Sequence, residues 1–141
     1  MKRILVGVDE SEESRAAANY AADLANACGS ELLIASVVHV PAAFDSPELI
    51  AREASWRAEE TTRLGQFVKS LATKVGRPGL KVEAVVANGL PAEVLADLAA
   101  TNNVEMVVVG HRGRGAIKRL LVGSVADRLV QICTKPVLVV R

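Results

Sequence analysis

Residues 104–124 decide the fold, and they read Val-Glu-Met-Val-Val-Val-Gly-His-Arg-Gly-Arg-Gly-Ala-Ile-Lys-Arg-Leu-Leu-Val-Gly-Ser. The run 104–109 is apolar with a single exception, as is typical of a strand buried on both faces of a parallel sheet. It stops at Gly110. Beyond the loop, apolar residues recur at helical spacing, and Ser124 with Asp127 three residues later forms a capping-box pattern. The sequence therefore predicts a strand, a loop and a helix with Ser124 as its N-cap.

The loop between this strand and helix contains glycines and four basic side chains, Arg112, Arg114, Lys118 and Arg119. Glycine lets a backbone approach a ligand closely, and a helix N-terminus presents free N–H groups at the positive end of its dipole. The combination predicts a phosphate-binding site. In the structural alternative the glycines only make turns, Ser124 only caps its helix and the basic residues form a solvated face. The spacing matches neither a Walker A loop nor the dinucleotide-binding fingerprint.

Length and composition limit the classes of protein to which the chain can belong. The 141 residues fit one domain, 1–141, with a sizeable core. Only 3% are aromatic and the net charge is +1, which argues against nucleic-acid binding. No apolar stretch approaches membrane-spanning length and no secretory signal is recognised, so we expect a cytoplasmic location without membrane insertion. Cys28 and Cys133 lack metal-binding spacing, and reduced thiols are the default expectation.

Strands and helices alternate along the whole chain. Strands are expected over 4–8, 32–40, 80–87, 104–109 and 136–140, and helices over 11–28, 46–75, 91–101 and from 124 onward. This order predicts an open α/β domain with a parallel sheet and helices on both faces. The third strand alternates polar and apolar residues and is placed at or near an edge. Gly65 makes an unbroken second helix less secure.

In such sheets, ligands lie beyond the carboxyl ends of the strands, where the strand order reverses. Asp9 follows the first strand and Gly110 ends the fourth. If these two strands are neighbours, Asp9 and the glycine loop meet at one edge of the sheet. An isolated Asp at a strand end is otherwise often only a turn or helix cap, so the loop opposite it is what favours a binding role.

The pattern Gly110-x-x-Gly113, nine residues, then Gly123-Ser124 resembles the nucleotide-binding motif of the universal stress protein family, in its ATP-binding branch. The similarity extends to the opening Ile-Leu-Val-Gly-Val-Asp segment with Ser11 and Ser14, and to the closing Lys-Pro-Val-Leu-Val-Val segment. It implies a five-stranded parallel sheet of order 3-2-1-4-5, Rossmann-like and similar to the adenine nucleotide alpha hydrolases. It also implies a homodimer through strand 136–140, an apolar edge that needs a partner.

The resemblance further implies a set of ATP-binding residues. Asp9 would accept a hydrogen bond from the ribose with Val8 beside it, and backbone groups around Val37 would meet the adenine. At the end of the fourth strand, Gly110 would lie against the ribose, and Val109 before it belongs to the same nucleotide-binding set. The residues around the triphosphate would be Arg112, Gly113, Gly123, Ser124 and Val125, acting largely through main-chain N–H groups and the Ser124 hydroxyl. Any Mg²⁺ would be held through the phosphates, since no protein side chain is identified as a metal ligand.

One position departs from the family pattern. Ala126 stands where some relatives have a hydroxyl residue that could touch phosphate. The difference removes one hydrogen bond, on the order of 1 kcal/mol. Two histidines have a functional alternative. His111 is expected to be exposed in the loop, where contact with phosphate is the alternative, and His39 is expected to end its strand, where a place beside the base is the alternative. Trp56 is expected to serve as surface packing or a partner contact.

The resulting functional prediction is an ATP-binding sensor or signalling module of the stress response that acts on an unidentified protein partner. Phosphoryl transfer requires charge neutralisation and a positioned nucleophile or base. With Asp9 assigned to the sugar, no base is found, so at most slow ATP hydrolysis is expected. The alternatives are a nucleotide-transferring enzyme, a nucleotide-free dimeric scaffold, and cyclic AMP in place of ATP.

Overall fold

The computed structural model describes residues 2–39, 47–112 and 123–141. Strands and helices alternate through these ranges: β1 (Arg3–Gly7), α1 (Glu12–Cys28), β2 (Glu31–Val38), α2 (Pro47–Val75), β3 (Val82–Asn88), α3 (Pro91–Thr101), β4 (Met106–Gly110), α4 (Ser124–Ile132) and β5 (Val137–Val140). The strands pair in parallel in the order β3-β2-β1-β4-β5. The fold class and strand order expected from the sequence are therefore confirmed, including the edge position of β3.

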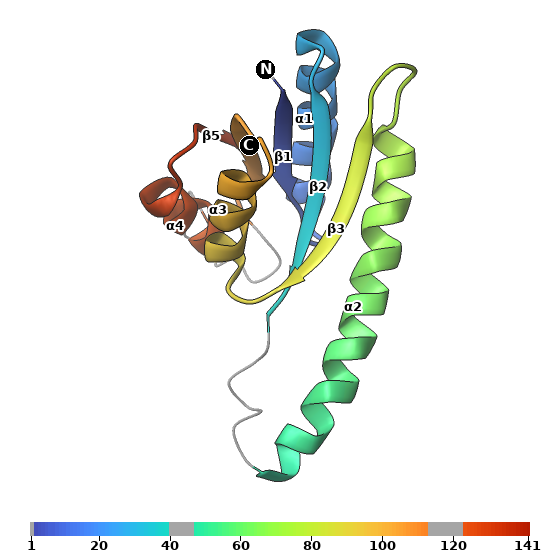
Figure 1. Ribbon diagram of the computed structural model, residues 1–141, viewed down its shortest axis with the longest axis vertical. Helices are drawn as coiled ribbons and strands as arrows, with labels where there is room; N and C mark the ends of the chain where they lie inside the picture. The colour runs from blue at the N-terminus through green and yellow to red at the C-terminus, as the bar shows by residue number, and fades with distance from the viewer. Residues whose placement is uncertain (1, 40–46, 113–122) are drawn as a thin grey trace.

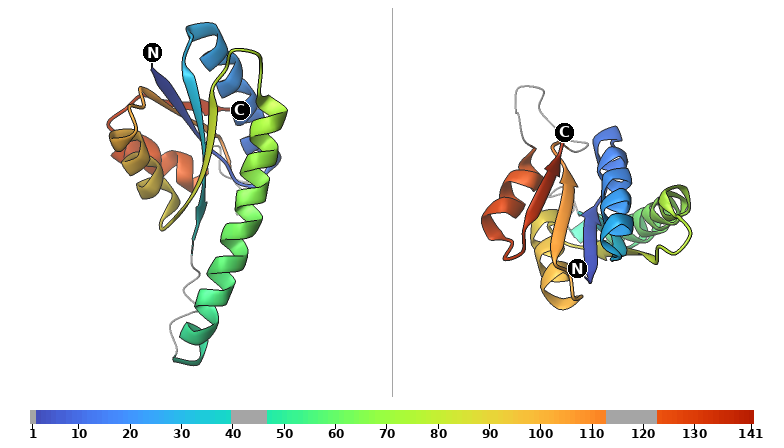
Figure 2. Two further views of the ribbon diagram at one scale, coloured as in Figure 1. Left: turned by 45° about the vertical axis from the view of Figure 1, so that its right-hand side comes forward. Right: turned by 90° about the horizontal axis from the view of Figure 1, so that it is seen from above.

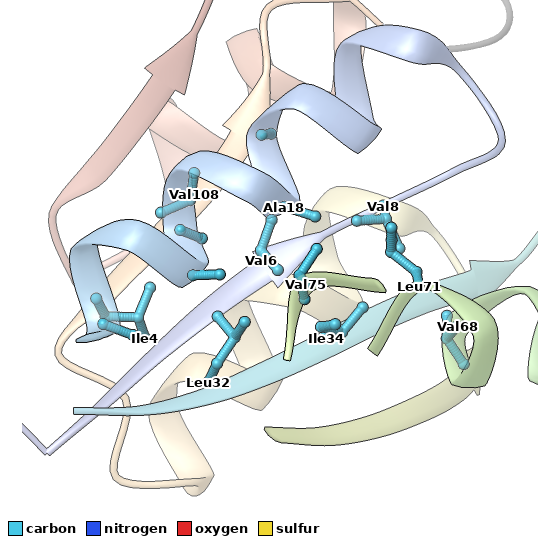
Figure 3. Packing of buried hydrophobic residues seen from close by; sticks show 14 residues of the cluster. Ile4, Val6, Val8, Ala18, Leu32, Ile34, Val68, Leu71, Val75 and Val108 are labelled. Atoms are coloured by element: carbon cyan, nitrogen blue, oxygen red, sulfur yellow. The ribbon is translucent and has the colours of Figure 1, made fainter. Parts of the chain in front are cut away.

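The helices cover both faces of the sheet. Helices α1 and α2 lie on one face, and α3 and α4 on the other (Figures 1 and 2). Successive residues of a strand point to opposite faces, so Ile4 and Val6 of β1 contribute to the core under α1 and α2 (Figure 3), whereas Leu5 contributes to the core under α3 and α4. All three side chains are fully buried.

Helix α1 lies close to the sheet because its inward face is built of alanine. Ala17, Ala18, Ala21, Ala22 and Ala25 are all fully buried. Ser11 caps the helix by accepting a hydrogen bond from the Ser14 N–H, and Gly29 ends it in the left-handed conformation, with φ of 67°. These two boundaries agree with the sequence-based prediction.

Helix α2 is continuous to Val75, as the sequence predicted, and Gly65 does not interrupt it. It packs on β2 and β3, and Val68, Leu71 and Val75 are buried in the core on this face of the sheet. This packing outweighs the weak helical preference of one glycine. The expected N-cap, Ser46, lies outside the described residues.

Length separates α2 from the other helices. Its 29 residues span about 44 Å, whereas the eight residues of β2 span about 26 Å. The N-terminal part of α2 therefore extends past the carboxyl edge of the sheet (Figure 1). None of the described helices combines the length and apolarity needed to cross a bilayer.

Candidate functional site

A cavity of about 470 Å³ lies at the carboxyl edge of the sheet, where β1, β2 and β4 end. The crossover helices change faces between β1 and β4, and open α/β sheets bind ligands at such a switch point. Nine of the ten sequence-predicted site residues line the cavity: Val8, Asp9, Val37, Val109, Gly110, Arg112, Gly123, Ser124 and Val125. Gly113 lies outside the described residues, as do the basic residues Arg114, Lys118 and Arg119. Contact of these residues with a nucleotide stays a prediction.

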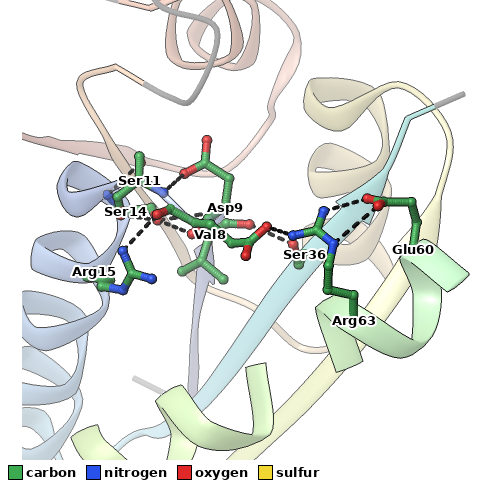
Figure 4. Close-up of polar contacts among 9 residues, drawn as sticks. Val8, Asp9, Ser11, Ser14, Arg15, Ser36, Glu60 and Arg63 are labelled. Atoms are coloured by element: carbon green, nitrogen blue, oxygen red, sulfur yellow. Dashed lines mark hydrogen bonds and ion pairs between the residues drawn. The ribbon is translucent and has the colours of Figure 1, made fainter. Parts of the chain in front are cut away.

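Asp9 is held in a fixed turn at the end of β1. The buried Ser14 hydroxyl donates a hydrogen bond to the Asp9 carbonyl at 2.5 Å and accepts one from the Asp9 N–H at 3.1 Å (Figure 4). The Asp9 carboxylate accepts a hydrogen bond from the Ser11 N–H at 2.8 Å. Asp9 thus has the capping role that its strand-end position allowed, and its side chain also borders the cavity.

The neighbouring residue, Val8, is fixed by a buried serine of β2. The Ser36 hydroxyl donates to the Val8 carbonyl at 2.9 Å, and the Val8 N–H donates to the Ala35 carbonyl at 2.8 Å. Ser36 is only 2% exposed and lines the cavity. Sequence reasoning missed it, although a lone serine inside the apolar run 32–38 is a readable signal because buried hydroxyls require partners.

We expect Ser36→Ala to lower the free energy of unfolding by about 1–3 kcal/mol, because the Val8 carbonyl would remain buried without its partner. Ser70→Ala is the matched control, since Ser70 is exposed on α2, and its effect should stay within about 0.5 kcal/mol. Urea unfolding measures both changes. Equal effects of the two substitutions would show that the Ser36 hydroxyl does not hold the end of β1.

His111 is partly buried, so the expectation of an exposed loop histidine is wrong. Its backbone N–H donates to the Val140 carbonyl at 2.8 Å, which fixes the residue against β5. Its Nε2 lies 3.0 Å from Nε of Arg112, and arginine only donates. Nε2 is therefore the acceptor of this hydrogen bond, and Nδ1 lies 3.3 Å from the Val140 carbonyl oxygen.

Arg112 is positioned by two neighbours at the rim of the cavity. Besides its hydrogen bond to His111, its guanidinium lies 3.5 Å from the Glu13 carboxylate of α1. Its side chain remains about one-third exposed. The guanidinium is thus oriented without being buried, and it provides a fixed positive charge beside the end of β4.

Helix α4 begins one residue earlier than its capping-box pattern predicted. Gly123 is the N-cap and Ser124 the first helical residue, with no side-chain cap hydrogen bond. The reason is that the Gly123 carbonyl accepts the hydrogen bond from the Asp127 N–H at 3.0 Å, while the Gly123 N–H donates to the His111 carbonyl. Gly123, Ser124 and Val125 at this end of α4 line the cavity, and the N-terminal end of a helix favours an anion.

Packing against α3 holds α4 in place. Ala126 and Leu129 are buried at 2% and 0% exposure. Arg128 of α4 lies 3.1 Å from Glu93 of α3, and this guanidinium holds the pKa of the Glu93 carboxyl below its ordinary value. The favourable contribution of this exposed pair is thus present above the ordinary carboxyl pKa and is lost as the pH falls through the lowered value.

The opposite end of the cavity differs in chemistry. It is lined by Val37, Val38 and His39 at the end of β2, and by Trp56, Glu60 and Leu64 of α2. Sequence reasoning favoured a surface role for Trp56, because the sequence did not show that α2 extends beyond the sheet. For His39 it favoured a strand end over a place beside the base. In the described part of the chain, no group of three His, Cys, Asp or Glu side chains could hold a metal ion.

The cavity has the size and polarity that a nucleotide requires. Ligand pockets commonly measure about 300–1,000 Å³ and combine apolar walls with a few polar groups. The ends of β2 and β4 flank β1, so they lie about 10 Å apart. A nucleoside with its phosphates can bridge that distance, with the phosphates near Arg112 and α4 and the base near β2.

A parallel sheet with a cavity of this kind at its switch point defines a doubly wound α/β ligand-binding domain. Within that class, the family model described as Universal stress protein family matches residues 1–141, and the chain belongs to this family. The resemblance noted in the sequence is therefore confirmed.

Individual relatives match nearly the whole chain. Universal stress protein YxiE of Bacillus subtilis is 31% identical over 158 residues, covering 99% of this chain and 98% of the relative. The solved structure of protein MJ0577 of Methanocaldococcus jannaschii aligns with a TM-score of 0.85 and 23% identity, covering 99% of this chain and 94% of that one. A universal stress protein solved in complex with cAMP aligns with a TM-score of 0.70 and 24% identity, covering 99% and 97%. At these identities the two structural likenesses establish the fold alone.

Proposed function

We propose that the chain binds ATP, or a related adenine nucleotide, in the cavity at the carboxyl edge of the sheet. One observation carries this proposal: the cavity gathers nine of the ten residues of the nucleotide-binding pattern around one space. Membership of the family and the fold shared with a cAMP-bound relative support it.

The charges and donors suggest how the nucleotide is oriented. Arg112 and the first turn of α4 would hold the phosphates, because both favour negative charge. Asp9 and Gly110 would flank the ribose between them, and Val37 would meet the base. A Mg²⁺ ion would be held by the phosphates.

We infer that binding serves signalling rather than turnover. Among the described cavity residues, Asp9 is tied to the Ser11 N–H and Glu60 to Arg63, so neither is a ready base for activating water. Slow hydrolysis is the most that we expect. The nucleotide-bound state would then act on a protein partner in the stress response.

Dimerisation through β5 and a cytoplasmic location belong to the same proposal. Strand β5 ends the sheet on one side, and its residues Val137–Val140 are all partly exposed. An apolar edge strand is prone to pair with a second copy.

Arg112→Ala should weaken ATP binding about tenfold to a hundredfold, because it removes a charge-assisted hydrogen bond worth about 1.5–3 kcal/mol. Adenosine, which has no phosphate, should bind the variant and the wild type equally. Arg57→Ala is the control, since Arg57 pairs with Glu53 on the exposed side of α2. If Arg112→Ala weakened adenosine and ATP equally, the phosphates would not lie near Arg112.

Calorimetric titration with ATP, ADP and cAMP in the presence of Mg²⁺ tests the proposed function. We expect micromolar ATP binding, and phosphate release too slow to exhaust the ATP during the titration. Absence of binding by a folded, nucleotide-free sample would overturn the proposal and favour a dimeric scaffold. Rapid turnover would instead establish an enzyme.

A further inference from the structure

One face of α2 packs on the sheet toward the C-terminal end of the helix and lines the cavity toward its N-terminal end. Val68, Leu71 and Val75 on this face are buried in the core against the sheet, and the buried Leu64 lines the cavity. Trp56 and Glu60 continue this row of side chains toward the N-terminus at i, i+4 spacing, so they lie on the same face of the helix. Because α2 extends past the carboxyl edge at this point, these two side chains face the cavity instead of the sheet.

This part of the cavity lies beside the end of β2, away from the phosphate end. Its other walls are the apolar Val37, Val38 and Leu64, together with His39 after the end of β2. A partly buried indole beside aliphatic side chains matches the flat, weakly polar surface of a purine base better than it matches a charged phosphate.

Glu60 is held in one orientation by Arg63 on the same helix. The guanidinium donates to both carboxylate oxygens, with Nε–Oε1 and Nη2–Oε2 distances of 3.1 Å and 2.6 Å (Figure 4). Arg63 also pairs with Glu10, the residue after Asp9, which ties α2 to the turn that follows β1. Each oxygen of a carboxylate accepts more than one hydrogen bond. Glu60, with a side chain 25% exposed, can therefore still accept one from a ligand.

We propose that Trp56 and Glu60 form the base-recognising wall of the cavity: Trp56 stacks on the purine ring and Glu60 accepts a hydrogen bond from the exocyclic amine of adenine. Arg63 is a positioning residue, which aims the Glu60 carboxylate. This proposal rests on the proposed nucleotide binding and adds that α2 recognises the base of the nucleotide.

Trp56 is the only tryptophan of the chain, so its fluorescence reports on this wall directly. Saturating ATP should change the tryptophan emission, because the base lies against the indole. Inorganic tripolyphosphate has no base and should leave the emission unchanged at concentrations that displace ATP. An ATP complex established by calorimetry without any change in emission would overturn the stacking.

Substitutions separate the two roles. Trp56→Ala should weaken ATP binding about tenfold, while Trp56→Phe should restore most of the affinity because it retains an aromatic face. For Glu60, the probe is purine riboside triphosphate, which differs from ATP only in lacking the exocyclic amine. Wild-type protein should bind it about tenfold more weakly than ATP. Glu60→Ala should remove that difference, and Glu59→Ala, an exposed neighbour, should retain it.

Failure of this proposal and failure of nucleotide binding give different results. If ATP binds wild type but Trp56→Ala and Glu60→Ala leave its affinity and the amine preference unchanged, the base lies elsewhere and only the wall is refuted. If wild type binds no nucleotide, both proposals fall. Circular dichroism of each variant verifies that α2 stays folded, and Trp56→Phe provides a second test should Trp56→Ala unfold.

Discussion

Leu129→Ala is expected to lower the free energy of unfolding by about 2–5 kcal/mol, the range for truncating a buried leucine. Leu129 is fully buried in the core under α3 and α4. It is the largest buried side chain of the short helix α4, whose first turn borders the cavity. The loss should therefore loosen the same helix end that we propose holds the phosphates.

The adjacent residue provides the control. Val130 is 57% exposed, and Val130→Ala should change stability by no more than about 0.5 kcal/mol. Chemical denaturation of the three proteins measures the difference, and a ligand that occupies the cavity should raise the midpoint of each. A Leu129→Ala effect as small as that of Val130→Ala would contradict the packing of α4 described above.

Gly110→Ala should destabilise the protein by about 1–3 kcal/mol and weaken ATP binding about tenfold. A Cβ at this position would lie 2.9 Å from the carbonyl carbon and oxygen of Glu13, which belong to the backbone of α1. Backbone cannot rotate away as a side chain can, so β4 and the first turn of α1 must separate. That movement would widen the cavity between Asp9 and Arg112.

Gly65→Ala is the matched comparison, with the opposite expected sign. Gly65 lies inside α2, and nothing stands within 4 Å of the position that a Cβ would take. Alanine should stabilise the helix by about 0.5–1 kcal/mol and leave ATP affinity unchanged. Thermal unfolding and ATP titration of both variants give the result. If Gly110→Ala were as harmless as Gly65→Ala, the close approach of α1 to β4 would be wrong.

The alternation of strands and helices allowed the fold to be predicted from the sequence, since glycine, proline or capping residues separate the successive apolar runs. The same regularity placed Asp9 and Gly110 at one edge of the sheet, and the structure does bring them to one cavity. Even so, the start of α4 was displaced by one residue. Whether Gly123 or Ser124 is the N-cap depends on the hydrogen bond from the Gly123 N–H to the His111 carbonyl, and this contact cannot be inferred from the local sequence.

Long-range packing also explains the other differences. His111 is partly buried because it contacts Val140 at the end of β5, 29 residues away along the chain. Trp56 lines the cavity only because α2 extends beyond the strands on which it packs. The helical pattern in the sequence shows which face of α2 carries Trp56, but not which residues lie opposite that face. Ser14 and Ser36 secure Val8 and Asp9 through contacts that become visible only once the strands are paired.

Titration of ¹⁵N-labelled protein with ATP, followed by amide NMR spectra, tests the central claim most directly because it shows both binding and its place. We expect the largest shifts at Gly110, Gly123, Ser124 and Val125, with little change at Gly29 and Gly79 near the opposite edge. An unchanged spectrum, or shifts concentrated around Gly29 and Gly79, would contradict nucleotide binding at the carboxyl edge of the sheet.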